Sequence, residues 1–232
     1  MHNKLVSAVR TATAPIYLRL SFCLAMMGVN ACPLYAQHHT PTNTWSIPGI
    51  AYQQSESLKF SAQYGWSDYL HTDLLYVQAF IKVSKHVVLN PAYLYLNRHP
   101  PVGSAMPEHT LMNGVIFTTT LHHFIIEDRN VIWDRFREHA PDLHIYRNRL
   151  KVSWPLPGKL HQTRVYGFDE VWVRLNEFGW MRNRVAGGIS SNLTRWLNLD
   201  ASYALEQDNH NGRLNILFLQ ATLQLHHQQK GR

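Results

Sequence analysis

The sequence predicts an all-β protein: an antiparallel transmembrane β-barrel of roughly 10–12 strands with an Arg/Glu-rich polar lumen. Three observations lead to this fold class. Apolar and polar residues alternate along runs of about 9–12 residues, which is the repeat of a half-buried strand. Turn-forming stretches such as "NRHPPVGSAMP" and "QDNHNG" separate these runs. The polar faces carry charges at mid-strand, which suits a wet, enclosed interior.

The strands predicted in the first half of the chain follow this alternation. Residues 58–66 ("LKFSAQYGW") and 74–83 ("LLYVQAFIKV") put apolar side chains on one face and polar ones such as Gln78 on the other. Residues 86–97 ("HVVLNPAYLYLN") are apolar on both faces and contain Pro91. Because proline cannot donate to a strand ladder, this segment is a weaker strand prediction.

The second half of the chain repeats the pattern with more charge. In residues 124–136 ("FIIEDRNVIWDRF"), Glu127 and Arg129 lie two positions apart and therefore share one face. Alternating segments follow at residues 146–154 ("YRNRLKVSW"), 195–203 ("RWLNLDASY") and 215–225 ("NILFLQATLQL"). Each of them has one apolar and one polar face, so we predict a strand in each.

Two barrel architectures fit such strands, and they differ in which face points inward. A soluble periplasmic barrel that binds a lipophilic ligand turns its apolar face inward, whereas a membrane barrel turns it toward lipid. Aromatic residues near strand ends favour the membrane barrel, since they can form interfacial girdles. These residues are Trp45, Tyr64, Trp66, Trp154, Trp172, Trp180 and Trp196.

Residues 1–36 have the order of a secretory signal. They contain basic but no acidic residues, then the short apolar run "SFCLAMMGV", then a small-residue cleavage site at Ala36. We therefore predict a signal peptide over residues 1–36, a flexible segment over 37–44, one barrel domain over 45–225 and a polar tail over 226–232. Removing the signal lowers the formal net charge from +7 to about +4 and removes both cysteines, which excludes disulfides, thiolate metal sites and a cysteine nucleophile.

Charged residues recur as same-face pairs, which we interpret as one charge network in the lumen. A charge that faces lipid at mid-bilayer costs about 2–4 kcal/mol, whereas Glu and Arg of neighbouring strands can compensate one another inside. Because similar charged pairs recur on several strands, whereas catalysis needs one particular constellation, we interpret Glu127 and Arg129 as a structural pair. The predicted network is Glu127, Arg129, Arg147, Arg149, Arg164, Glu170, Arg174, Arg182 and Arg184.

Asp169 breaks the alternation beside Glu170. A β-bulge, or the end of the membrane band, near residues 168–170 would explain this irregularity.

A lipid hydrolase or deacylase is the alternative from another functional class. The chain contains the residue types of a Ser-His site, but no nucleophile motif surrounds any of the serines. Adjacent histidines on a strand point to opposite faces, so their pairs predict no metal site. We therefore expect no catalytic residue, no metal and no cofactor. The residues considered are His122, His123, Ser153, Ser190, Ser191 and Asn192.

Five segments in order carry a resemblance to a known family: "HHFIIEDRNVIWDRF", "YRNRLKV", "FDEVWVRLN", "RNRVAGGIS" and "LNLDASYALEQ". They resemble the bacterial family catalogued as domain of unknown function 2490. The family typically has a His-Arg pair where this chain has His122-His123, and an Arg often follows the His of "EHT" at 108–110. The resemblance implies an outer-membrane β-barrel of a Gram-negative bacterium, and it implies no reaction.

These observations together predict a non-enzymatic outer-membrane barrel. We expect an even number of antiparallel strands, because both ends of the barrel would then lie on the periplasmic side. Its role would be that of an envelope structural component or of a narrow pore for a small polar or anionic solute, since the inward faces carry excess arginine. The expected partners are outer-membrane lipid, lipopolysaccharide and, during insertion, the barrel-assembly machinery. Nucleic acid is not expected, because the arginines alternate with an apolar face that must be buried. The oligomeric state stays open.

Overall fold

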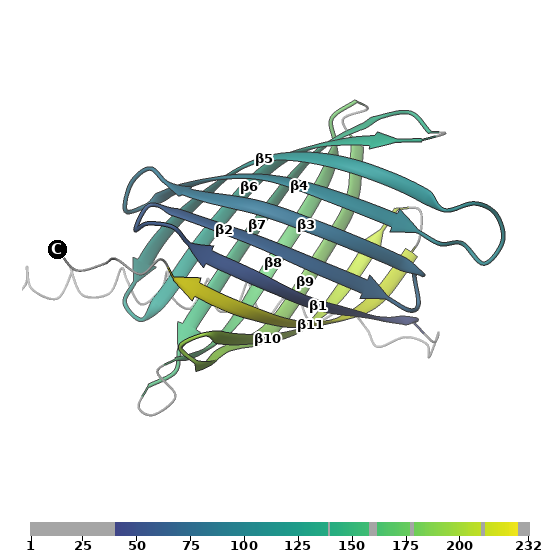
Figure 1. Ribbon diagram of the computed structural model, residues 1–232. Coiled ribbons are helices and arrows are strands. Elements are labelled where there is room, and N and C mark those ends of the chain that lie inside the picture. Colours follow the sequence, from purple (N-terminus) through teal and green to yellow (C-terminus); the bar gives the residue numbers. More distant parts are fainter. Residues whose placement is uncertain (1–39, 139, 158–161, 177–178, 210–211, 227–232) are drawn as a thin grey trace, which may run out of the picture. The chain divides into compact units, whose positions relative to one another are not determined.

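The computed structural model describes residues 40–138, 140–157, 162–176, 179–209 and 212–226. These residues form eleven strands in one closed barrel, and each strand is hydrogen-bonded to its neighbours in the sequence (Figure 1). In the described part of the chain, no helix is long and apolar enough to cross a membrane. The strands are β1 (Thr42–Gln53), β2 (Leu58–Ser67), β3 (Thr72–Lys82), β4 (Val87–Arg98), β5 (Met106–Leu121), β6 (Phe124–Arg137), β7 (Leu143–Pro155), β8 (Thr163–Arg174), β9 (Gly179–Thr194), β10 (Leu197–Asp208) and β11 (Gly212–His226).

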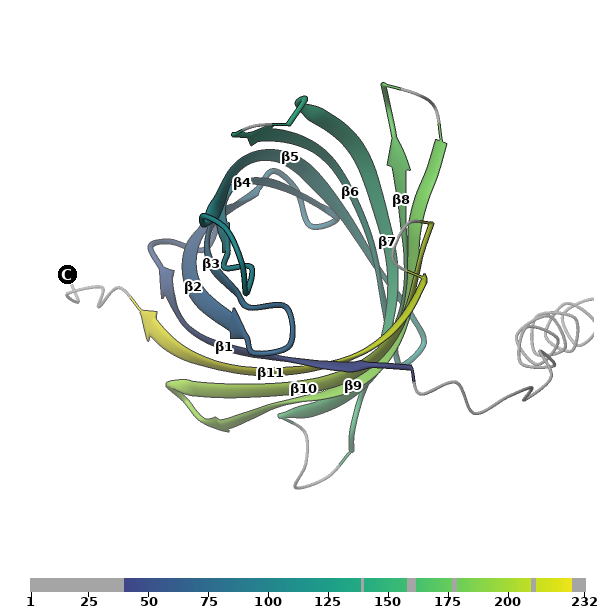
Figure 2. The same cartoon turned by 90° about the vertical axis from the view of Figure 1, so that its right-hand side faces the viewer.

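The barrel closes between β1 and β11, and this closure is parallel (Figure 2). All other neighbouring strands are antiparallel hairpin partners. Eleven strands joined by hairpins make the first and last strands run in the same direction. The all-β barrel and its range of strand number are confirmed, but the expectation of an even number of strands with antiparallel pairing throughout is wrong.

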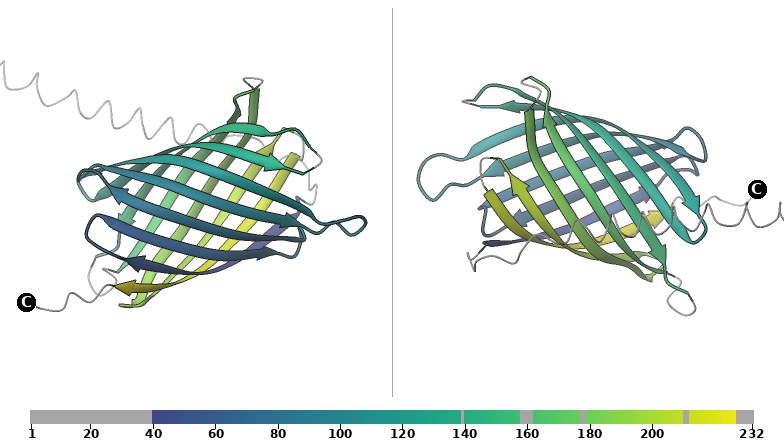
Figure 3. Two further views of the ribbon diagram at one scale, coloured as in Figure 1. Left: turned by 45° about the horizontal axis from the view of Figure 1, so that its top comes forward. Right: turned by 180° about the vertical axis from the view of Figure 1, so that it is seen from behind.

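The two faces of the barrel wall are as the alternation predicts, with apolar side chains outside. Leu75 and Val77 on β3 are 42% and 40% exposed, whereas Gln78, the residue after Val77, is 8% exposed and points into the lumen. The strands run diagonally around the barrel (Figure 3). Exposed apolar side chains occur on many of them, for example Leu111 on β5, Leu199 on β10 and Leu219 on β11. A soluble barrel with an apolar interior would need the reverse arrangement, and the structure contradicts that alternative.

Pro91 lies inside a complete strand, although it weakened the prediction for this segment. The pairing of β3 with β4 skips the position where Ala79 would face Pro91. There the side-chain amide of Asn90 donates a hydrogen bond to the carbonyl oxygen of Ala79, at 2.9 Å. Asn90 therefore supplies a donor at the place where proline has no N–H.

The limits of the barrel differ slightly from the predicted domain bounds. β1 begins at Thr42, ahead of the predicted start at Trp45, because Thr42 and the residues after it pair with β11 from Asn215 onward. β11 ends at His226. The predicted signal peptide over 1–36 lies outside the described residues, as does the tail from residue 227 on, and both stay predictions.

Apolar side chains fill part of the lumen. Trp45, Ala186, Ala204 and Ile216 form a buried cluster against which Phe218 and other side chains pack. Two further clusters centre on Leu94, Met112 and Val131 and on Leu143, Ile145 and Trp172. The interior is therefore narrower than the ring of strands alone would leave it.

Gly188 on β9 gives a test of this packing. A Cβ at this position would lie 2.6 Å from the Tyr166 hydroxyl and 2.6 Å from the Ser202 Cβ. The Tyr166 hydroxyl donates a hydrogen bond to Asp200 Oδ1 at 2.6 Å. We expect Gly188→Ala to displace the tyrosine and to lower the free energy of unfolding by about 1–3 kcal/mol, measured by urea unfolding in lipid vesicles.

The neighbouring glycine is the matched control for this substitution. A Cβ at Gly187, which faces outward, would meet its nearest atom at 3.9 Å. Gly187→Ala should leave the unfolding free energy within about 0.5 kcal/mol of the wild type. Equal effects of the two substitutions would contradict the close packing at Gly188.

Candidate functional site

Five inward-facing residues of neighbouring strands form one continuous row across the lumen wall, which we name the Arg/Glu rung. Each is the direct cross-strand partner of the next, from β6 through β7, β8 and β9 to β10. The members of the Arg/Glu rung are Arg129, Arg149, Glu170, Arg184 and Glu206. Four of them come from the predicted network, so the alternation placed them on the correct face, and the register then lined them up.

The carboxylates of the Arg/Glu rung are bonded on both sides. Glu170 is 1% exposed, and its Oε1 accepts a hydrogen bond from Arg147 Nε at 2.6 Å. Its Oε2 lies 3.5 Å from Arg184 Nη1. Arg184 Nε in turn donates to Glu206 Oε2 at 3.0 Å. Arg182 Nη1 lies 3.4 Å from Glu206 Oε1. The charges of Glu170 and Glu206 are thus compensated by Arg147, Arg182 and Arg184, which stabilises them away from bulk water.

A second charged group lies toward the end of the barrel where β1 begins, which we call the Thr42 end. Arg182 Nε donates to Asp208 Oδ2 at 2.9 Å, and Arg135 binds Glu108 through two hydrogen bonds of 2.7 and 2.6 Å. A cavity of about 240 Å³ opens here, and Arg174 of the predicted network contributes to its wall with Arg135, Arg182 and Asp208.

Aromatic rings separate the guanidinium groups of this wall. Trp172 has the guanidinium carbons of Arg147 and Arg184 over its ring, at 5.0 and 4.9 Å from the centroid. Such contacts stabilise cations that lie away from bulk water. Trp172 was predicted to lie in an outer aromatic girdle, as was Trp45, but both point inward and are only 4% and 8% exposed. The other five predicted girdle residues are exposed: Tyr64, Trp66, Trp154, Trp180 and Trp196.

Glu127 and Arg129 share a face as predicted, yet they bind different partners. Glu127 Oε2 lies 3.8 Å from Lys151 Nζ on β7. Arg129 Nη2 donates to the Tyr76 hydroxyl of β3 at 2.8 Å. Of the remaining network residues, Arg164 lies near the start of β8, is exposed, and forms no ion pair with a described residue. The acid and the base of the Glu127–Arg129 motif therefore do not form a pair of their own.

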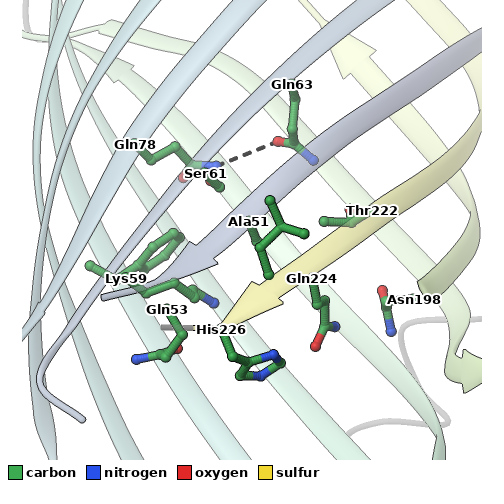
Figure 4. Close-up of a pocket in the computed structure, with 12 residues that line it drawn as sticks. Ala51, Gln53, Lys59, Ser61, Gln63, Gln78, Asn198, Thr222, Gln224 and His226 are labelled. Carbon is green, nitrogen blue, oxygen red and sulfur yellow. Dashed lines mark hydrogen bonds between the residues drawn. The ribbon is translucent and has the colours of Figure 1, made fainter. Parts of the chain in front are cut away.

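The opposite end of the lumen, which we call the His226 end, holds a cavity of about 320 Å³ that is lined mainly by uncharged polar side chains. Figure 4 shows amide side chains from β1, β2, β3, β10 and β11 gathered around it. Gln78 Nε2 donates to Gln63 Oε1 at 3.4 Å, and Gln63 Nε2 donates to Gln220 Oε1 at 3.5 Å. The cavity is lined by Gln53, Lys59, Gln63, Gln78, Asn198 and Gln224, among others. We call it the amide-lined cavity.

The sequence interpretation missed several members of the lumen wall. The odd or even position of each residue along its strand could have identified them. Glu206 and Asp208 lie at even spacing from Asp200, on the face opposite the exposed Tyr203 and Leu205. Arg135 shares the odd-numbered face of Glu127 and Arg129. No such rule joins Glu108 to Arg135 or Tyr76 to Arg129, because those contacts depend on strand register.

The outer face of β6–β9 carries a polar cluster that the prediction did not contain. Asn148 Nδ2 donates to Asp128 Oδ1 at 2.6 Å, and Asn183 Nδ2 donates to Asp169 Oδ1 at 2.7 Å. Asp169 therefore breaks the charge alternation because it points outward, where an amide of the next strand satisfies it. The bulge expected near residues 168–170 lies instead between Trp172 and Val173.

The residues considered for a hydrolase lie apart. Ser191 Oγ is 2.7 Å from Thr163 Oγ1, Ser190 Oγ accepts from Asn198, and His122 is in the tight turn between β5 and β6 with a φ of 56°. Within the described ranges, no hydrogen bond joins a serine hydroxyl to a histidine ring. The same residues contain no group of three or more His, Cys, Asp or Glu side chains that could hold a metal ion.

Comparison with known proteins gives a family and two similar solved structures. "Outer-membrane expressed OmpT of Vibrio cholerae" has a TM-score of 0.38 and 12% identity, over 66% of this chain and 52% of that chain. A loop L8 deletion mutant of OmpT, described as an outer membrane protein of Vibrio cholerae, has a TM-score of 0.39 and 13% identity, over 71% of this chain and 58% of that chain.

The chain therefore spans little more than half the length of these two structures. No curated protein matches the sequence. The family described as "Protein of unknown function (DUF2490)" matches residues 42–216, which cover β1 through most of the barrel. This chain, whose described residues form a closed β-barrel, belongs to the DUF2490 family.

Proposed function

We propose that this protein is a non-enzymatic barrel of the Gram-negative outer membrane that lets small anions pass through a narrow lumen. The observation that carries the proposal is the cationic excess at one end of the Arg/Glu rung. Arg129 and Arg149 face each other across β6 and β7, and no described carboxylate accepts a hydrogen bond from either. Rings of arginine and lysine side chains favour anions in pores.

The arrangement along the lumen supports a polar passage. The amide-lined cavity lies at the His226 end and the charged cavity at the Thr42 end, with the Arg/Glu rung between them. Neutral amides exchange hydrogen bonds with a hydrated solute without selecting its charge. The sign of the permeating ion would then be set at the rung, where the uncompensated guanidinium groups lie.

The proposal includes a location and a set of partners. Residues 1–36 would direct export and be removed, and the barrel-assembly machinery would insert the chain. The apolar outer face would contact outer-membrane lipid and lipopolysaccharide, because exposed apolar side chains such as Phe60, Leu150 and Leu219 surround the barrel. Lipid and lipopolysaccharide would therefore bind the outer face of the barrel and not the lumen.

Ion selectivity tests this function directly. We expect the refolded protein in a planar bilayer, under a potassium chloride gradient, to give a reversal potential of the sign that chloride permeation sets. The double substitution Arg129→Gln, Arg149→Gln should lower the chloride-to-potassium permeability ratio roughly tenfold, which corresponds to about 1.4 kcal/mol. Arg213→Gln, which removes an exposed arginine from β11, should not change the ratio.

Cation preference in the wild type, or the absence of conductance, would overturn the anion passage.

A structural role in the envelope is the second candidate, and the apolar clusters that fill part of the lumen favour it. That role predicts a barrel without conductance whose deletion makes cells sensitive to large antibiotics and detergents.

A further inference from the structure

Arg129 and Arg149 are the two members of the Arg/Glu rung that lack an acidic hydrogen-bond partner. They are direct cross-strand partners on the inward faces of β6 and β7. The Nε atom of each is buried and has no hydrogen-bond partner among the described residues. Like charges placed directly opposite one another destabilise a sheet, and a buried donor without an acceptor adds to that cost.

The nearby carboxylates cannot supply the missing acceptor, because other side chains already hold them. Glu170 is the direct cross-strand partner of Arg149, but its Oε1 accepts from Arg147 Nε and its Oε2 faces Arg184. Glu127, one inward position from Arg129, lies beside Lys151. The protein's own carboxylates therefore leave the two arginines without an acidic acceptor, which an external anion could supply.

Both guanidinium groups are held in position although no carboxylate binds them. The Tyr76 hydroxyl accepts a hydrogen bond from Arg129 Nη2 at 2.8 Å. The guanidinium carbon of Arg149 lies 5.4 Å from the centroid of the Phe168 ring. Fixed donors of this kind lose little freedom when a ligand binds, so they are suited to a specific site.

We propose that Arg129 and Arg149 bind a small oxyanion, such as phosphate, sulfate or a carboxylate, in the lumen. A guanidinium group presents planar N–H donors in a fork that matches two oxygens of one anion, which a halide cannot use. The Nε–H group of each arginine, which has no partner among the described residues, is one of the donors in that fork. This inference rests on the proposed anion passage and names the class of anion that the passage would select.

The site is next to the amide-lined cavity. Tyr76, which holds Arg129, precedes Gln78 by two positions on β3, and Gln78 is in the cavity wall. Lys59 is in the same wall, with its Nζ 4.5 Å from the Phe80 ring. An anion that enters from the His226 end would meet Lys59 first and the arginine pair next, so cationic side chains would line its path.

Equilibrium binding of inorganic phosphate to the purified barrel tests the site. In an uncharged detergent without phospholipid, calorimetry should show saturable binding of phosphate and sulfate and at least tenfold weaker binding of chloride. Because no phospholipid is present, phosphate that binds under these conditions is the free anion and cannot be a lipid headgroup. If phosphate binds no more tightly than chloride, the oxyanion site is wrong.

Substitutions distinguish bidentate binding from simple attraction between charges. Arg149→Lys keeps the charge but loses the fork, and it should weaken phosphate roughly tenfold or more while chloride is unaffected. Tyr76→Phe frees Arg129 and should weaken phosphate severalfold. Arg164→Lys, at an exposed inward arginine outside the pair, is the control and should change neither affinity. Phosphate binding that survives both of the first two substitutions would contradict the proposal.

The outcomes for the site and for the passage are separable. Anion-selective conductance without phosphate binding supports the passage and overturns the site. Phosphate binding without conductance supports the site and overturns the passage. A gel shift between boiled and unboiled samples shows in each case that the variant has folded, and if Arg149→Lys does not fold, Tyr76→Phe decides.

Discussion

Glu170→Gln should destabilise the barrel more than any other single change to the lumen wall. It removes the one carboxylate that Arg147 and Arg184 share, at a position that is 1% exposed. Because both arginines would stay in place with less compensation, we expect the free energy of unfolding to fall by about 3–5 kcal/mol. Urea unfolding in lipid vesicles, followed by tryptophan fluorescence, measures this loss.

Two further variants separate charge from packing in that experiment. Glu56→Gln makes the same chemical change in an exposed turn and should alter the unfolding free energy by less than about 0.5 kcal/mol. Adding Arg147→Gln to Glu170→Gln removes one of the uncompensated cations and should restore part of the stability. A loss below about 1 kcal/mol for Glu170→Gln would show that the arginines do not depend on this carboxylate.

Val77→Arg should be the most damaging change on the outer face of β3. Val77 lies at the middle of the strand, is 40% exposed and points outward. In a bilayer its replacement puts a charge at the depth where arginine costs about 2–4 kcal/mol. The same unfolding measurement in vesicles of defined thickness gives the value.

Val83→Arg is the depth control, because Val83 follows the end of β3 and is 63% exposed. Its cost should be about 0–1 kcal/mol, as expected near the membrane interface. Equal costs at the two positions would mean that the outer face of β3 does not lie across a hydrocarbon layer.

The sequence predicts which face each strand presents, because the alternation of side chains has a period of two and needs only local information. It placed the predicted arginines and Glu170 on one side, and it placed Leu75 and Val77 on the other. Two aromatic residues were misassigned where position near a strand end was weighed above parity: Trp45 and Trp172 point inward.

Partnership between strands could not be predicted in the same way. A pairing register is a relation between distant segments, and a shift by two residues would keep every face while exchanging every partner. That Arg149 faces both Arg129 and Glu170, or that Tyr76 reaches Arg129 from β3, follows from register and curvature alone. The amide-lined cavity was missed for the same reason, since its glutamines come from strands far apart in the sequence.

The parallel pairing of β1 with β11 separates the two ends of the barrel domain. β1 starts at the Thr42 end and β11 finishes at the His226 end, so the first and last residues of the barrel lie at opposite mouths of the lumen. In the outer membrane that we propose for this protein, one of these ends would face the cell exterior and the other the periplasm. A protease added to intact cells would remove an epitope tag placed at only one of these two positions, and the position that it cleaves would reveal which mouth of the lumen faces the medium.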